Sequence, residues 1–225
     1  MRAPISVIIP TLNAAHTLPH CLTALMEGLD AGIIRELIVS DGGSNDATGA
    51  LAQAWGAEVI HGPASRGGQL RRACAQAKGD WLLIVHADTA LQKGWADEMR
   101  RHIDASGDAG WCRLKFDKGG MPAFLVARWA NLRSRFGLPY GDQGLLISAA
   151  LYVRIGGYPD IPLMEDVALA RMLKGRLRPL NTVATTSADK FVTQGWMRRG
   201  IRNLWTLIRY GAGSDPDQLA RAYRR

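Results

Sequence analysis

Polar side chains stand at the ends of three strand-like runs in the first ninety residues. The set comprises Pro10, Thr11 and Asn13 after residues 5–9, Asp41 after residues 33–40, and His86 and Asp88 after residues 81–85. In an open parallel sheet, ligands bind beyond the carboxyl ends of the strands. Asn, Asp and Gly also favour turns whatever the function. Convergence of three strand ends nevertheless predicts a polar ligand site at one rim of the sheet.

Two common nucleotide-binding motifs are absent from these positions. The segment Asp41–Asp46, Asp-Gly-Gly-Ser-Asn-Asp, is not followed by the Lys-Ser/Thr of a P-loop. The first strand is followed by Pro-Thr-Leu-Asn and not by GxGxxG. Both phosphate-binding loops of these types are therefore excluded.

Alternating strand and helix patterns must position the polar residues. Apolar residues in the first hundred positions predict strands at 5–9, 33–40, 57–61 and 81–85, with helices at 14–27, from Asn45 or Asp46 to about 55, and at 67–78. This order is typical of a parallel sheet with right-handed crossovers. Further strands are expected at 110–116, 144–148 and 177–183, and helices at 122–135 and 164–174. Pro179 places the last strand at a sheet edge.

Composition restricts the class of protein. The chain has 225 residues, of which 47% are hydrophobic and 21% charged, as in an ordinary globular protein. No apolar run approaches the roughly 18 residues of a membrane span, and no signal-peptide pattern is present. Three widely separated cysteines predict neither a disulfide framework nor a cysteine zinc site. We therefore expect a cytoplasmic protein.

The net charge of +8 is concentrated at the C-terminus. Residues 190–225 hold eight basic and two acidic side chains, a net of +6, so the preceding residues are almost neutral. The chain also lacks the aromatic and basic signature of RNA-binding sheets. A nucleic-acid partner is therefore not expected, and the charge belongs to a basic helix at about 191–210.

Three ordered segments resemble the motifs of glycosyltransferase family 2. They are Ser6–Asn13, Val39–Thr48 and Val85–Thr89, and Met164-Glu165-Asp166 is similar to a further motif of that family. A finer pattern, adding Gly141-Asp142-Gln143-Gly144, resembles the small soluble subgroup associated with arsenosugar biosynthesis. The resemblance implies an α/β GT-A fold, with a mostly parallel central sheet flanked by helices and a basic C-terminal helix. It also implies a nucleotide-diphosphate sugar as the donor, with a UDP sugar as the first candidate.

The resemblance assigns a donor site to the rim. Asp41 would accept hydrogen bonds from the nucleoside, and Pro10 and Asn13 would line the same pocket. Arg66, at the start of the helix 67–78, could reach a phosphate group.

A divalent cation is implied at Asp88, which takes the last position of the family's DxD motif. Its carboxylate would hold Mg²⁺ or Mn²⁺ against the diphosphate. His86 replaces the first aspartate of that motif. It could contact a ribose hydroxyl, a phosphate or the metal, and it could equally be an ordinary rim histidine.

Asp166 matches the position of the general base that takes a proton from the acceptor hydroxyl, with inversion at the sugar. Alternatively, Glu165 and Asp166 are a plain acidic pair at a helix start, where their charge only stabilises the helix through its dipole. Asp142 and Gln143 lie between the metal and base motifs, so they and Glu165 are candidate acceptor or sugar contacts. Turn formation is an equal alternative for the loop 141–144.

The basic C-terminal helix allows two functions. Arg198 or Arg202 could contact the diphosphate, with the apolar stripe of the helix docked on the core. Alternatively, the helix could lie on the inner face of an anionic membrane as a peripheral contact. The QxxRW motif and the membrane spans of processive relatives are absent, so polymer synthesis is not expected. His16 and His20 lack a third ligand and are expected at the surface.

The sequence thus predicts one domain over 1–225, with a nucleotide-sugar half (1–100), an acceptor and catalytic half (101–189) and a basic helical segment (190–225). It would be an inverting, non-processive, metal-assisted glycosyltransferase acting on a small-molecule or lipid-linked hydroxyl. One alternative is a nucleotidyltransferase, which would usually show a basic glycine-rich loop after the first strand. The other is a non-catalytic protein that binds a nucleotide or a membrane surface.

Overall fold

One mixed sheet organises the chain. The structure is a computed structural model that describes residues 2–224, so Arg225 of the basic segment lies outside the described residues. Within that range, eight strands pair in the order β3-β2-β1-β4-β7-β6-β8-β5. Their bounds are β1 Ile5–Thr11, β2 Ile34–Asp41, β3 Glu58–His61, β4 Trp81–Ile84, β5 Thr89–Leu91, β6 Ala109–Phe116, β7 Leu145–Ser148 and β8 Leu177–Thr186.

The first half of the chain confirms the predicted parallel arrangement. Strands β1, β2, β3 and β4 are mutually parallel, and helices α1 (Leu18–Asp30), α2 (Thr48–Ala54) and α3 (Arg66–Gln76) connect them. Helix α1 begins four residues later than predicted, because Pro19 is accommodated in its first turn. Helix α2 begins at Thr48, whose backbone N–H donates to the Asp46 carboxylate 3.0 Å away. Asp46 therefore precedes the helix.

The second half differs from the expected pattern. Strand β7 is antiparallel to both β4 and β6, and β5 is antiparallel to β8, whereas β6 and β8 are parallel. The prediction that residues 177–183 lie at a sheet edge is confirmed around Pro179, although β5 covers the far end of β8 at residues 184–186. Pro179 is tolerated because β5 pairs only with residues 184–186, which leaves β8 open on one side at the proline.

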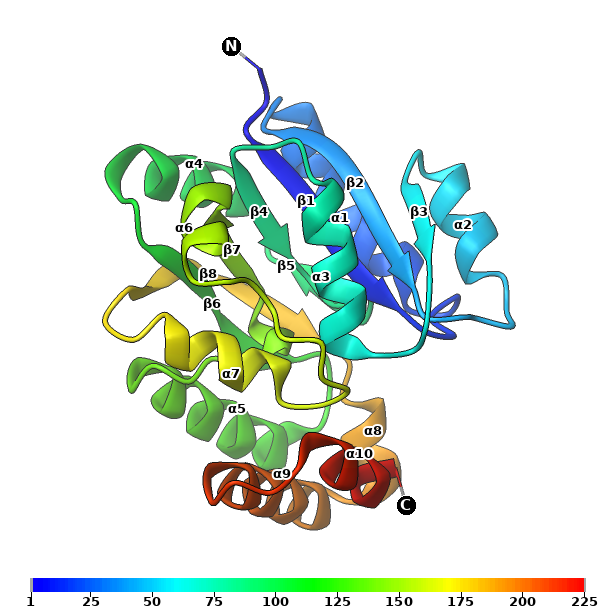
Figure 1. The fold of residues 1–225 in the computed structure, drawn as a ribbon, viewed down its shortest axis with the longest axis vertical. Coiled ribbons are helices and arrows are strands. Elements are labelled where there is room, and N and C mark those ends of the chain that lie inside the picture. Colours follow the sequence, from blue (N-terminus) through cyan, green and yellow to red (C-terminus); the bar gives the residue numbers. More distant parts are fainter. Residues whose placement is uncertain (1, 225) are drawn as a thin grey trace.

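Helices cover both faces of the sheet (Figure 1). The remaining elements are α4 Trp95–Ala105, α5 Gly120–Arg135, the short 3₁₀ helix η1 Gly141–Gln143, α6 Ala149–Arg154, α7 Glu165–Met172, α8 Asp189–Gln194, α9 Trp196–Gly211 and α10 Pro216–Arg224. One apolar core lies between the sheet and α1 and α4, and a second lies between the opposite face and α3, α6 and α7. Among residues 2–224, no helix has the length and apolar character needed to cross a membrane.

The C-terminal helices pack at one end of the molecule, beyond the carboxyl end of β6. The predicted helix 191–210 is interrupted at Gly195, which adopts a φ of 82° and separates α8 from α9. Phe116 at the end of β6 packs edge-on against Phe191 and Trp196. These aromatic contacts fix α8 and α9 against α5.

The first turn of α3 packs against residues 159–161, a segment that precedes α7. The backbone N–H of Gly67 donates to the carbonyl of Ile161 at 3.0 Å. A Cβ atom at residue 67 would lie 2.1 Å from the carbonyl oxygen of Pro159, which belongs to the same segment. At Gly68 a Cβ would instead meet the Asp160 carboxylate, a side chain that can turn away.

The substitution Gly67→Ala is expected to lower the free energy of unfolding by about 1–3 kcal/mol, because backbone must move to admit the methyl group. Gly68→Ala is the matched control, since both changes gain about 1 kcal/mol of helix propensity. Urea unfolding of the two variants measures the difference. Equal stabilities would show that the segment 159–161 does not pack on α3 in this way.

Candidate active site

A cavity of about 710 Å³ opens at the carboxyl ends of β1 and β4. Its wall is built from the two halves of the sheet and from the C-terminal helices. The predicted site residues that line it are Pro10, Asn13, Arg66, His86, Asp88, Asp142, Asp166 and Arg202. Four further predicted residues, Asp41, Gln143, Glu165 and Arg198, do not line it.

The loop after β1 is fixed to the loop after β2. Asn13 adopts a left-handed conformation with a φ of 49°, which asparagine tolerates better than most residues. Its side-chain oxygen accepts the N–H of Asn45 at 2.9 Å, and its own N–H donates to Ser44 Oγ at 2.8 Å. Gln69, a residue the sequence did not single out, donates to the carbonyls of Thr11 and Ser40. These contacts hold both strand ends in one rim.

Asp41 lies behind this wall, with 2% of its surface exposed. Its carboxylate accepts hydrogen bonds from Thr11 Oγ1 and Ser44 Oγ and from the N–H groups of Gly43 and Ser44. Burial would raise the pKa of Asp41, but these donors lower it below its ordinary value. A direct contact to a nucleoside would require one of these hydrogen bonds to be exchanged.

His86 and Asp88 both line the cavity. Lys190 Nζ is 3.5 Å from Asp88 Oδ2. Burial opposes ionisation of Asp88, but Lys190 and Arg66 outweigh it and keep the pKa of this carboxyl low. Burial, reinforced by the Arg66 charge, lowers the pKa of His86 to about 3, so its imidazole is neutral at physiological pH. His86 Nε2 is buried without a hydrogen-bond partner within residues 2–224.

Asp166 faces the cavity from the first turn of α7. The preceding Met164 has a φ of 68°, a left-handed conformation that bulky side chains rarely adopt. The Asp166 carboxylate accepts the N–H of Val167 at 2.7 Å and the N–H of Gly141 at 3.0 Å. The base candidate is therefore held by the backbone of η1 and of the first turn of α7.

Glu165 is placed differently from its neighbour. It is buried behind the cavity, with 1% of its surface exposed, and Oε1 lies 3.6 Å from Arg66 Nε. Burial and the Asp166 charge raise the pKa of Glu165, against the opposing charge of Arg66. In this structure Glu165 supports Arg66 from behind the cavity, and its contact with acceptor or sugar stays a prediction.

The loop after α5 adds one predicted and one unpredicted residue. Asp142 lines the cavity, and burial raises its pKa to about 6, with Asp166 and Asp88 adding to the effect. Tyr140 also lines it, with the Arg133 guanidinium 3.2 Å from its ring centroid. Gln143 is instead fully buried and bonds Ser134 Oγ and the carbonyl of Cys112. The Gln143 side chain thus ties α5 to β6, and its ligand contact stays a prediction.

The C-terminal helices close the cavity with basic groups. Arg199 and Arg202 line it, and both donate to Gln194 Oε1. Of the two predicted alternatives, Arg202 lines the cavity, whereas Arg198 is exposed and does not line it. Helix α10 contributes Tyr223, whose hydroxyl accepts from Arg199 at 3.1 Å.

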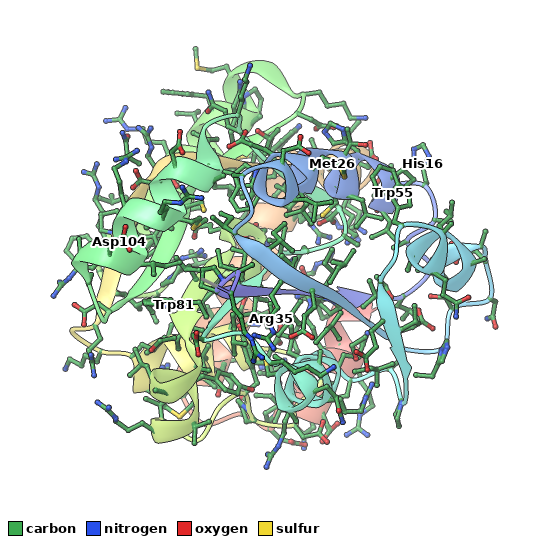
Figure 2. The ribbon with its side chains drawn as sticks, turned by 90° about the horizontal axis from the view of Figure 1, so that it is seen from above. His16, Met26, Arg35, Trp55, Trp81 and Asp104 are labelled. Carbon is green, nitrogen blue, oxygen red and sulfur yellow. The ribbon has the colours of Figure 1, made fainter. Side chains whose placement is uncertain are left out.

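No metal centre formed by protein ligands alone is present in the described part of the chain. Residues 2–224 contain no group of three or more His, Cys, Asp or Glu side chains that could hold an ion. His16 and His20 are exposed, as predicted, and His16 lies at the periphery of the molecule (Figure 2). The carboxylates that line the cavity are those of Asp88, Asp142, Asp166 and Asp189.

Comparison with known proteins places this cavity in context. The model of the family "Glycosyl transferase family 2" matches residues 6–147. A TPR repeat-containing protein of Synechococcus elongatus is 35% identical over 147 residues, which cover 62% of this chain and 35% of that protein. A PGL/p-HBAD biosynthesis glycosyltransferase of Mycobacterium tuberculosis is 36% identical over 109 residues, or 45% of this chain and 41% of that one. The chain thus spans well under half the length of these relatives.

Solved structures share the fold at low identity. The S. aureus protein TarS (residues 1–349) has a TM-score of 0.64 and 18% identity, over 96% of this chain and 68% of that chain. Glucosyl-3-phosphoglycerate synthase from M. tuberculosis, in complex with Mn²⁺, UDP and phosphoglyceric acid, has a TM-score of 0.57 and 24% identity, over 82% and 69% of the two chains. These likenesses confirm the predicted GT-A fold.

Proposed function

Because the chain belongs to glycosyltransferase family 2, we propose that it transfers a single sugar from a nucleoside-diphosphate donor to a hydroxyl acceptor. One observation carries the proposal. Asp88 and Asp166 line the same cavity as four cationic side chains, Arg66, Lys190, Arg199 and Arg202. A diphosphate needs such positive charge, and a hydroxyl nucleophile needs a carboxylate nearby.

The donor is proposed to be a UDP sugar. TarS has been crystallised with UDP-GlcNAc, and the M. tuberculosis synthase with UDP and Mn²⁺. In this chain, Pro10 and Asn13 would line the nucleoside end of the cavity, with Asp41 as a hydrogen-bond acceptor or as the anchor of that wall. The half 1–100 would therefore bind the donor, and 101–189 would supply the acceptor and catalytic groups.

A divalent cation fits the cavity as a companion of the donor. Mg²⁺ or Mn²⁺ is commonly held by one or two carboxylates together with substrate phosphates and water. Asp88 is such a carboxylate, with Lys190 3.5 Å away as the charge that balances it in the ligand-free protein. When bound, the ion would neutralise charge on the departing diphosphate.

Asp166 is proposed as the general base. It would take the proton of the acceptor hydroxyl, whose oxygen forms a bond to the anomeric carbon as the bond from that carbon to the diphosphate breaks. Direct displacement inverts the anomeric configuration. Arg66, Arg199 and Arg202 would stabilise the charge that develops on the leaving diphosphate. Asp142, protonated below about pH 6 because of its burial, lies where it can contact sugar or acceptor hydroxyls.

The remaining alternative from the sequence is a nucleotidyltransferase. A family-2 enzyme would release UDP from a UDP sugar when supplied with lipid and small-molecule extracts containing hydroxyl acceptors. A nucleotidyltransferase would instead release pyrophosphate from UTP and a sugar phosphate. We expect UDP release in the first assay and no pyrophosphate in the second. Pyrophosphate release without UDP release would overturn the proposal.

A further inference from the structure

Helices α5 and α9 present a broad apolar surface to solvent at one end of the molecule. The two helices contact each other and lie next to one another at the end far from the N-terminus (Figure 1). Large apolar side chains on them, and on the residue that follows α5, have exposed fractions between 43% and 80%. They are Met121, Phe124, Leu125, Trp129, Leu132 and Phe136 on the α5 side, and Met197, Ile201, Leu204, Trp205 and Ile208 on α9. We call these eleven residues the apolar platform.

The platform is separate from the cavity, although α9 contributes to both. Arg199, Arg202 and Asn203 line the cavity, whereas Ile201, Leu204 and Ile208 recur at the helical spacing that defines the opposite face. On α5, the buried face consists of alanines at 123, 127 and 130, and the large residues point outward. Of the two alternatives for the apolar stripe, docking on the core applies only to Trp196, and the rest of the stripe is exposed.

The charged side chains on the two platform helices, α5 and α9, are of one sign. Neither α5 nor α9 contains an Asp or Glu, and together they hold seven arginines. Arg128, Arg135 and Arg198 are exposed beside the apolar residues. Monomeric soluble proteins rarely expose a contiguous apolar patch larger than a few hundred Å². A patch with a basic margin and two exposed tryptophans, Trp129 and Trp205, has the composition of a membrane-interface surface.

We propose that the apolar platform docks on an anionic lipid surface, with its apolar side chains in the interface and its arginines at the lipid headgroups. A second copy of the chain is a poorer occupant. Two platforms facing each other would gather arginines from both copies with no carboxylate on either helix to pair them.

Docking would place the cavity close to the membrane. Cavity and platform lie on opposite faces of α9, so they are separated by about one helix diameter, roughly 10 Å. Resting on the proposed function, this geometry favours a lipid-linked hydroxyl acceptor over a freely diffusing one.

Vesicle sedimentation tests the proposal. One set of vesicles is phosphatidylcholine, and the other contains in addition about one third phosphatidylglycerol, the anionic component. We expect the protein to sediment with the anionic vesicles and less with the neutral ones, and high salt to weaken binding. Ile201→Ser with Trp205→Ser should lower the anionic-vesicle affinity about tenfold or more. Arg128→Glu with Arg135→Glu should remove the preference for anionic lipid.

The matched controls are Val153→Ser and Arg154→Glu on α6, which are exposed but lie outside the platform. Both should bind vesicles as the unmodified protein does. Absence of sedimentation, or equal binding by the platform variants, would overturn the proposal. A dimer that Ile201→Ser with Trp205→Ser converts to a monomer would also overturn it, and would identify a second copy as the occupant. UDP should still raise the melting temperature of every variant. A failure of membrane docking is therefore distinguishable from a failure of the proposed function, in which UDP would not stabilise the protein.

Discussion

Replacing Asp166 by asparagine is expected to reduce sugar transfer by about 10²–10⁴-fold, the usual contribution of a general base. Asparagine has nearly the same shape, but its amide cannot take the acceptor proton. UDP binding should be unchanged, because the donor contacts lie on other elements. The measurement is UDP release under saturating donor, together with the melting temperature with and without UDP.

The substitution also affects the backbone around residue 166. Its carboxylate accepts two backbone N–H groups, from Gly141 and Val167. The asparagine oxygen can accept one of them, so the variant should lose about 1 kcal/mol of stability. Asp104→Asn is the control, because Asp104 is exposed on α4 at the periphery (Figure 2). Full turnover by Asp166→Asn would remove Asp166 as the base.

Replacing Asp88 by asparagine is expected to abolish the part of UDP affinity that depends on Mn²⁺. In the unmodified protein, Mn²⁺ should raise UDP affinity about tenfold or more over EDTA, because the ion links the Asp88 carboxylate to the diphosphate. The asparagine variant loses the charged oxygen that the ion prefers. Calorimetric titration of UDP with and without Mn²⁺ measures both quantities.

The same substitution leaves Lys190 without its carboxylate partner. That lysine then attracts the diphosphate directly, so some metal-independent UDP binding should remain. Asp104→Asn should behave as the unmodified protein. If Asp88→Asn kept the full Mn²⁺-dependent gain, the cation would not be held by Asp88.

The rim of the sheet was predictable because its strands carry strong local signals. Residues 81–85 form a continuous apolar run, and residues 5–9 are apolar except for Ser6. Only a sheet covered on both faces can bury such strands. Once these strands are parallel, the polar residues after them must share one edge. The placement of Asn13, His86 and Asp88 around one cavity follows from that rule alone.

Side-chain direction within the site was less predictable. Asp41 and Gln143 belong to polar motifs, yet both are buried and satisfied by neighbouring residues. A carboxylate or amide that organises a loop has the same sequence signature as one that binds a ligand. Among adjacent arginines, the choice between Arg198 and Arg199 depends on the helix phase, which Gly195 resets by interrupting the predicted helix.

Long-range pairing accounts for the other differences. Strand β5 has three residues and no periodicity to detect, and it is fixed by pairing with β8 nearly a hundred residues later. Lys190 and Tyr140 reach the cavity only because α8 and η1 pack around it. The outward direction of the platform residues likewise depends on Trp196 and the alanines of α5, which occupy the space against the core.

The most direct test of a nucleoside-diphosphate donor site in this cavity is the melting temperature of the unmodified protein with UDP and Mn²⁺. At a UDP concentration about 100-fold above Kd, binding contributes about 2.7 kcal/mol. For a domain of this size, that raises the melting temperature by about 5–10 °C. UMP, which lacks the diphosphate, should give a much smaller rise. The absence of any shift with UDP or with other nucleoside diphosphates would contradict the account.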